Sequence, residues 1–124
     1  MKAGVEWIIL CHHAELDKDG LYDLRGLFTD LAVAEFPMVI TDLQFVLRAF
    51  GQPGTSIDLV AQVELDGKAV FQNPSAKIEF GEKGETVEAL RFRRIPVAHP
   101  GTLSIMLMSE GTVLTHTSFI VSRL

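Results

Sequence analysis

Residues 5–28 read VEWIILCHHA-ELDKDG-LYDLRGLF, and this stretch decides the fold class. An apolar run that carries Trp7 enters a polar segment closed by Asp19-Gly20, and a second apolar run leaves it. Glycine adopts the positive φ that tight turns need, and aspartate bonds to nearby backbone amides. The pattern therefore predicts two antiparallel strands joined by a loop.

The clearest alternation in the chain runs over Ile57–Leu65, where an apolar residue occupies every second position. Period-two alternation predicts a strand with one buried face. Asp66-Gly67 follows directly and favours a type I′ turn, whose two central residues need positive φ. We expect Lys68–Gln72 to pair back against this strand, Asn73-Pro74 to turn the chain, and Ala76–Phe80 to form a further short strand.

The region before this hairpin contains one predicted strand and one ambiguous segment. Val39–Phe50 alternates as a strand. Phe36-Pro37 interrupts the chain ahead of it, because proline donates no ladder hydrogen bond and pushes its predecessor to extended geometry. Thr29–Glu35 fits either a strand or a short connection.

The C-terminal third predicts three more strands. Residues 86–95 fit a helical period and a strand period, and their position between strand blocks favours a strand that ends at Pro96. Leu103–Met108 and Thr112–Val121 predict a last hairpin around Glu110-Gly111.

Turn signals thus recur every eight to twelve residues or so, and no long amphipathic helix is present, which is typical of an all-β domain. We expect an immunoglobulin-like antiparallel β-sandwich of about seven to nine strands. The Cys…Trp…Cys pattern of antibody domains is absent. At 124 residues, the chain fits a single domain spanning 1–124.

Composition suggests partners and a compartment. The chain is 48% apolar, and so small a domain leaves part of that surface exposed, which favours a homo-oligomer or a protein partner. A net charge of −5 lacks the basic character of nucleic-acid binders, so no nucleic-acid partner is expected. One cysteine, Cys11, permits no internal disulfide and favours the cytoplasm. No apolar run is long enough to span a bilayer, so no membrane association is expected.

Several short motifs point to one family. They are Trp7-Ile8-Ile9-Leu10-Cys11, Gly20, Leu24-x-Gly26-Leu27-Phe28, Phe36-Pro37, Pro100-Gly101-Thr102-Leu103 and Glu110-Gly111. With them the chain resembles, over nearly its full length, an uncharacterised family of small bacterial proteins known as a domain of unknown function. The resemblance implies an immunoglobulin-like β-sandwich and supplies no activity. Where many members carry an acidic residue after the cysteine, this chain has His12, so no acidic role transfers to that position.

Cys11, His12 and His13 invite a metal or catalytic interpretation, with His99 or His116 as distant partners. Neighbours on a strand point to opposite faces, so His12 and His13 do not readily share an ion. Cys11 follows an apolar run, which favours a buried structural thiol over a nucleophile. The sequence predicts no catalytic residue, no metal ligand and no cofactor.

Two further clusters have structural explanations. Counting a calcium loop from Asp17 puts Tyr22 and Phe28 where glycine and glutamate are needed, so a hairpin turn is the better interpretation. Arg91–Arg94 includes three arginines, which favour a solvated face with cross-strand ion pairs over phosphate contact. Met106 and Met108 make both faces of their strand apolar, which suits a subunit contact or a covered central strand.

Three functional hypotheses remain from the sequence. The favoured one is a non-enzymatic cytoplasmic protein that self-associates or docks a protein partner. The alternative is a small-ligand or metal-binding protein, or an enzyme, that uses the His12/His13 region. A weaker alternative is nucleic-acid contact through Arg91–Arg94. No G-x-S-x-G, P-loop, G-x-G-x-x-G or H-E-x-x-H pattern occurs.

Overall fold

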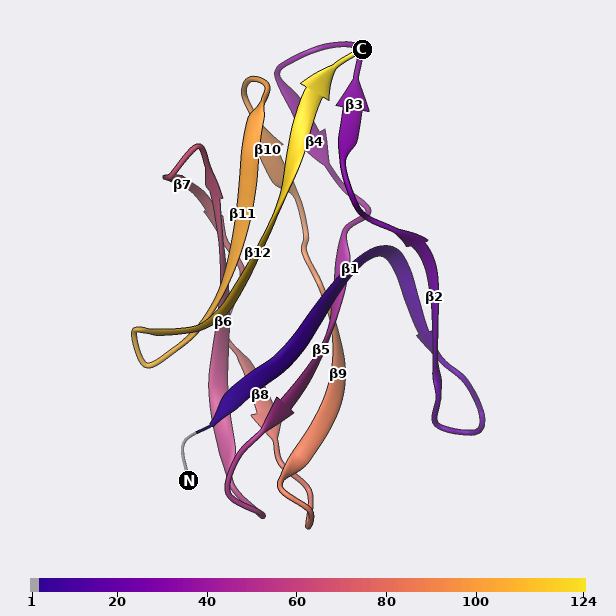
Figure 1. The fold of residues 1–124 in the computed structure, drawn as a ribbon, viewed down its shortest axis with the longest axis vertical. Helices are drawn as coiled ribbons and strands as arrows, with labels where there is room; N and C mark the ends of the chain where they lie inside the picture. The colour runs from indigo at the N-terminus through magenta and orange to yellow at the C-terminus, as the bar shows by residue number, and fades with distance from the viewer. Residues whose placement is uncertain (1–2) are drawn as a thin grey trace.

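The computed structural model describes residues 3–124, which form twelve β-strands and no helix (Figure 1). The all-β prediction is confirmed. The strands are β1 (Gly4–Leu16), β2 (Tyr22–Leu27), β3 (Leu31–Val33), β4 (Met38–Ile40), β5 (Gln44–Phe50), β6 (Ser56–Leu65), β7 (Lys68–Gln72), β8 (Ala76–Glu79), β9 (Glu85–Arg91), β10 (Ile95–Val97), β11 (Gly101–Ser109) and β12 (Thr112–Arg123).

The strands form two main sheets and one small pair. The first sheet has the order β2-β1-β5-β9, and the second has the order β3-β12-β11-β6-β7, with β8 also paired to β6. Strands β4 and β10 pair with each other. All these pairs are antiparallel except β3 with β12, which run parallel over three residues.

The core lies between the two main sheets. Phe45, Leu47 and Ala49 on β5 are buried against the inner faces of β6, β11 and β12, in one continuous apolar cluster. Because every second side chain of each strand enters this cluster, alternation along the strand sets which face is buried. Burial of this apolar face is the main source of the stability of the fold.

The predicted hairpins form where the sequence places them. Over Ile57–Leu65, alternate residues from Leu59 to Leu65 are buried in the core. Asp66 and Gly67 both adopt positive φ, at 49° and 83°, as a type I′ turn requires. Glu110 and Gly111 do the same between β11 and β12.

Two predicted strands are divided, because their halves join different sheets. The Val39–Phe50 prediction is wrong in extent: β4 ends at Ile40 and pairs with β10, whereas β5 begins at Gln44 and pairs with β1 and β9. The segment 86–95 is likewise divided into β9 and β10, with Phe92 buried between them. Pro96 lies inside β10, where a two-stranded pair leaves one edge free of ladder bonds.

The strand number also exceeds the predicted seven to nine. The surplus comes mainly from three strands of three residues each, β3, β4 and β10. Within the ambiguous segment 29–35, residues 31–33 pair with the end of β12. Such short strands form only because a partner strand from elsewhere in the chain lies beside them, so local alternation does not predict them.

Candidate functional site

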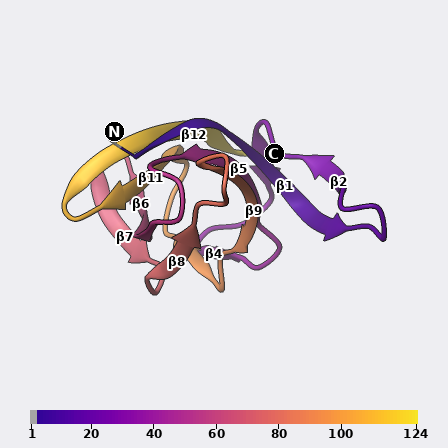
Figure 2. The same ribbon diagram turned by 90° about the horizontal axis from the view of Figure 1, so that it is seen from below.

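Strand β1 changes partners at Cys11. Its first half, Gly4 to Cys11, pairs with β5, and its second half, Cys11 to Leu16, pairs with β2. Residues 12–27 therefore form a two-stranded arm, the β1–β2 arm. It is the edge of the first sheet and projects beyond the part formed by β5 and β9 (Figures 1 and 2).

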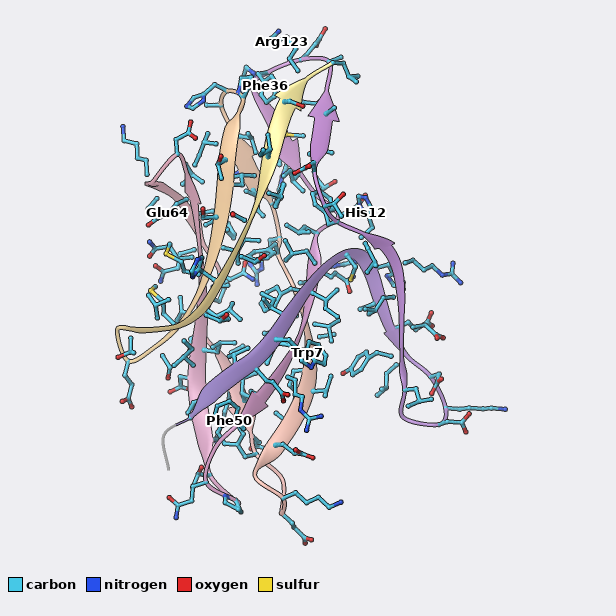
Figure 3. The ribbon with its side chains drawn as sticks, viewed as in Figure 1. Trp7, His12, Phe36, Phe50, Glu64 and Arg123 are labelled. Carbon is cyan, nitrogen blue, oxygen red and sulfur yellow. The ribbon has the colours of Figure 1, made fainter. Side chains whose placement is uncertain are left out.

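Side-chain contacts fix the arm where it leaves the sheet. The Ala14 backbone N–H donates to Gln44 Oε1 at 2.9 Å. The His12 Nδ1 atom lies 3.1 Å from the Asp42 carbonyl oxygen, and its ring meets the Phe28 ring edge-on at 4.9 Å between centroids. His12 lies at the bend of the strand (Figure 3). These contacts anchor the base of the arm to β5 and the segment before it.

The tip of the arm is a polar turn held by Asp17. Asp17 Oδ1 accepts hydrogen bonds from the backbone N–H groups of Asp19 and Leu21, at 2.8 and 2.9 Å. Gly20 adopts a φ of +81°. The turn prediction for this acidic stretch is confirmed, since its aspartate bonds to local amides.

Part of the first sheet is buried on the side that faces away from the core. The side chains of Phe45 and Leu47 enter the core, so those of Gln44 and Val46 between them point to the opposite face. Gln44 and Val46 are nevertheless buried. The arm supplies the cover, because Gln44 bonds to its backbone and Val46 shares a groove with its apolar residues.

This groove, which we call the arm groove, lies between the outer face of the first sheet and the β1–β2 arm. Its volume is about 670 Å³. Trp7, Leu16 and Leu21 in its wall are exposed by 36%, 57% and 66%. Trp7 lies on β1 in the first sheet, opposite Arg48 of β5 (Figure 3). The lining residues are Trp7, Leu16, Gly20, Leu21, Tyr22, Leu24, Val46, Val87 and Glu88.

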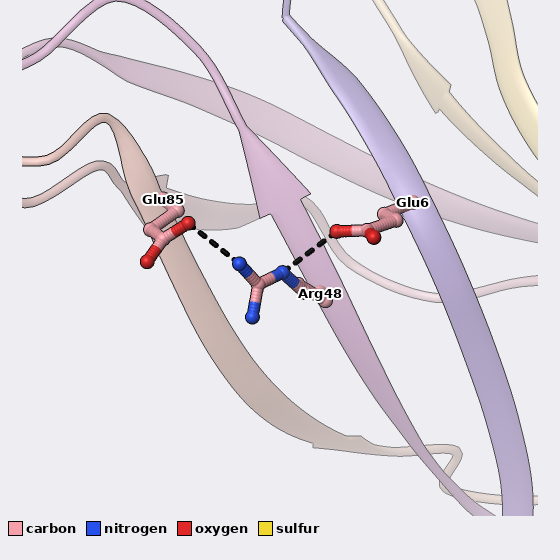
Figure 4. A network of polar contacts seen from close by, with 3 residues as sticks. All are labelled: Glu6, Arg48 and Glu85. Carbon is pink, nitrogen blue, oxygen red and sulfur yellow. Dashed lines mark hydrogen bonds and ion pairs between the residues drawn. The ribbon is translucent and has the colours of Figure 1, made fainter.

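Charges beside the groove are partly paired. Arg48 bonds to Glu6 through Nε at 2.7 Å and to Glu85 through Nη2 at 2.6 Å (Figure 4). Glu88 is half-buried, accepts a hydrogen bond from the Thr86 hydroxyl at 3.1 Å, and forms no ion pair within residues 3–124. In the β5–β9 register Glu88 lies opposite the core residue Leu47, so its side chain is on the core face of β9, and Val87 is the β9 side chain on the groove face.

Cys11 is fully buried. Burial raises the pKa of the Cys11 thiol, and the backbone hydrogen bond from His13 opposes this only in part. The neutral thiol is therefore the dominant form near neutral pH, which does not suit a nucleophile. The interpretation as a structural thiol agrees with this position.

The four histidines are not gathered into one site. His13 points toward Glu15, with Nε2 at 3.8 Å from Oε2, whereas His12 packs on Phe28. His99 lies beside Asp66, and His116 is on β12 opposite Met106. Within residues 3–124, no three His, Cys, Asp or Glu side chains are placed to hold one metal ion. The geometry gives no support to a site built on the His12/His13 region.

The arginine cluster differs from its prediction. Arg91 ends β9, Phe92 turns into the core, and Arg93 and Arg94 lie in the connection to β10. None of the three arginines forms an ion pair with another residue of the described chain. The expected cross-strand salt bridges are therefore wrong here, because the strand ends before the second arginine.

The face of β11 that carries Met106 and Met108 offers less exposed apolar surface than a subunit contact suggests. β11 is a central strand, and on its outer face Met106 lies between Gln62 of β6 and His116 of β12. Both methionines are half-buried. The large exposed apolar side chains instead include four between residues 7 and 27, at Trp7, Leu16, Leu21 and Leu27.

Sequence reasoning missed the arm groove, although one signal was present. Leucines 16 and 21 flank and enter a polar turn, where apolar side chains have no core to join. The bend that brings Leu24 and Val46 to one groove carries no local pattern, because it depends on where β1 exchanges β5 for β2 as its partner. The groove is thus a tertiary feature.

Across residues 3–124, no helix has the length and apolar character that a bilayer span requires.

Comparison with solved structures corrects one prediction. The chain is similar to an alkylpurine DNA glycosylase, AlkC, of Pseudomonas fluorescens, solved bound to DNA containing an abasic site analogue. The identity is 13% and the TM-score 0.49, over 93% of this chain and 30% of the glycosylase chain. Because this neighbour is a DNA-binding protein, the partner prediction, a second copy or a protein and no nucleic acid, is corrected to one that leaves the partner class open. At such similarity, the likeness carries no argument that this chain binds DNA.

Comparison by sequence gives a family. No curated protein matches the chain. A family described as one of unknown function, DUF6941, matches residues 6–122, nearly the whole length. The resemblance seen in the sequence to an uncharacterised family is confirmed. The chain belongs to DUF6941, a family of unknown function.

Proposed function

We propose that the protein is a non-enzymatic binding protein that takes an apolar small molecule with an amino group into the arm groove. The observation that carries this proposal is the groove of about 670 Å³, whose wall combines Trp7, Leu16 and Tyr22. Ligand pockets in proteins typically measure about 300–1,000 Å³ and are lined mostly by apolar and aromatic side chains with a few polar groups.

The exposed apolar side chains in the groove wall indicate that the ligand has an apolar part. Leu16 and Leu21 are more than half exposed in the groove wall, although leucine is usually buried. A ligand that covers them removes apolar surface from water, which favours binding by about 25 cal/mol per Å². Trp7 adds a rigid aromatic face of the kind that dominates many binding sites.

The negative charge around the groove indicates that the ligand carries an amino group. Two carboxylates beside the groove, Glu6 and Glu85, share the single guanidinium of Arg48, so one negative charge is left over there. The net charge of −5 also favours a cation over an anion near this surface. An ammonium group beside Glu6 or Glu85 would form a charge-assisted hydrogen bond and balance this excess negative charge.

Calorimetric titration with three matched probes tests the proposal. The probes are n-decylamine, n-decanol and decanoate, each below its micelle concentration. We expect the amine to bind tightest and decanoate weakest. Equal binding of all three would contradict the preference for an amino group, and no binding of any would contradict the whole proposal.

A pair of leucine and isoleucine variants locates the site. Leu16→Gln is expected to weaken decylamine binding about five- to tenfold, which corresponds to roughly 1–1.4 kcal/mol of lost apolar contact. Ile120→Gln is the control, because Ile120 is exposed to a similar degree on β12, outside the groove. An equal loss in both variants would mean that the amine binds elsewhere.

Two finer assignments belong to the same proposal. We propose an immunoglobulin-like arrangement, which the two antiparallel sheets around one core support. We also propose the cytoplasm as the working compartment, which is supported by the single, buried, unpaired cysteine.

A further inference from the structure

A second pocket opens between the two main sheets, next to the end of β9. Its volume is about 200 Å³. Arg91 and Arg93 lie at its margin from β9 and the connection that follows. The walls are Phe45, Leu59, Ala61, Asn73, Pro74, Ala76, Leu90, Arg91 and Arg93.

Asn73 is the buried polar residue in this pocket. The residue is only 9% exposed. Its backbone N–H donates to the Ala61 carbonyl at 2.9 Å, and its side-chain Nδ2 donates to the Arg91 carbonyl at 3.0 Å. The second contact fixes which end of the amide is nitrogen, since a carbonyl accepts only from N–H.

The other end of this amide has no partner. Asn73 Oδ1 is buried and accepts no hydrogen bond from any described residue. A buried unpaired acceptor costs about 1–3 kcal/mol, so native proteins rarely retain one without a reason. A ligand that brings an N–H donor into the pocket would relieve this cost.

The arginines indicate that the ligand of this pocket carries negative charge. Arg91, Arg93 and Arg94 are exposed and form no ion pair among residues 3–124. Guanidinium groups bind phosphate in a forked, two-bond geometry. Two of these residues, Arg91 and Arg93, border the pocket, and two guanidinium groups are suited to a dianion more than to a single carboxylate.

We propose that this pocket binds a nucleoside monophosphate unit, with the base inside and the phosphate on the arginines. A cavity of about 150 Å³ holds a benzene molecule, so 200 Å³ accepts one planar ring. The ring would stack on apolar side chains such as Leu59 and Leu90, and its amino group would donate to Asn73 Oδ1. This site is separate from the arm groove and shares none of its lining residues.

Nuclear magnetic resonance on the intact protein tests this site directly. The probes are cytidine monophosphate, cytidine, inorganic phosphate and a short single-stranded oligo(dC). We expect the monophosphate to shift the Asn73 side-chain amide resonance and to bind at least tenfold tighter than cytidine or phosphate alone. Oligo(dC) distinguishes the source: tighter binding than the mononucleotide means a nucleic-acid strand, and weaker binding means a free nucleotide.

Two arginine variants complete the test. Arg93→Gln is expected to weaken binding of cytidine monophosphate at least fivefold, whereas Arg25→Gln, an exposed arginine on β2, leaves it unchanged. Phosphate that binds as tightly as the monophosphate would overturn the inference, since the ring would then contribute nothing. Absence of any shift at Asn73 would also overturn it, and a buried water would then account for the free acceptor.

Discussion

At the scale of single residues, environment decides what each candidate can do. Cys11 is the only thiol, and burial keeps it neutral and inaccessible. His12 supports the bend of β1 through Phe28 and the Asp42 carbonyl. The apolar run before Cys11 predicted its burial, whereas the role of His12 could not be predicted, because the sequence does not say where β1 bends.

The buried thiol predicts a pH dependence of stability. The pKa of Cys11 is higher in the folded protein than in the unfolded chain, where it is about 8.5. The folded state therefore holds the proton more tightly, and its advantage is lost as pH rises above the unfolded value. Urea unfolding at pH 7.5 and pH 10 should show the free energy of unfolding fall more for the wild type than for Cys11→Ala. Equal falls would contradict the burial of this thiol.

Two glycines of the arm, Gly26 and Gly20, both have positive φ, but only Gly26 has a side chain packed against it. Gly26 has a φ of +65°, and a Cβ there would lie 2.5 Å from His12 Cδ2. Gly20 has a φ of +81° with no atom within 4 Å of such a Cβ. We expect Gly26→Ala to lower the free energy of unfolding by about 2–4 kcal/mol, from backbone strain plus displacement of His12.

Gly20→Ala should cost only the backbone term, about 1–2 kcal/mol. Thermal unfolding of the two variants measures the difference. If both lose the same stability, then His12 does not pack against Gly26 as the structure places it.

At the scale of elements, alternation and turn residues identify most strands but not their partners. Leu59 to Leu65 alternate cleanly, so β6 and its Asp66-Gly67 turn follow from the sequence. Val39–Phe50 also alternates, yet its two ends join different sheets. Periodicity records which face is buried and carries no information about the neighbouring strand. Likewise, Asn73-Pro74 predicts a turn, but the free acceptor there depends on Arg91, eighteen residues away.

The arm predicts a local effect on dynamics. Gln44→Leu removes the acceptor for the Ala14 N–H, which ties the arm to β5. Loss of one such bond costs about 1 kcal/mol, and the free energy for local opening of residues 12–27 should fall by a similar amount. Hydrogen–deuterium exchange should then be about fivefold faster in the arm peptides and unchanged in β11.

Gln62→Leu is the control for this measurement. Gln62 lies on β6 in the second sheet and bonds to the neighbouring Glu64 at 3.1 Å. Its replacement should leave exchange in the arm at the wild-type rate. Faster arm exchange in this variant would mean that the arm opens with the whole domain.

At the scale of the whole molecule, two sheets enclose one core, and the arm groove and the Asn73 pocket lie at their margins. The fold class and the family could be predicted from the sequence, because turn glycines and core residues are local signals. Both pockets escaped prediction, since each joins residues from several strands. Of the nine large apolar side chains exposed in residues 3–124, three line the arm groove: Trp7, Leu16 and Leu21.

Fluorescence of Trp7 tests the central claim most directly, because Trp7 is the only tryptophan and lines the arm groove. Titration with n-decylamine should shift its emission to shorter wavelength in a saturable manner, as its indole leaves water. Leu16→Gln should require about five- to tenfold more amine for half the shift. Emission that stays constant while decylamine binds would contradict the claim that this groove is the binding site.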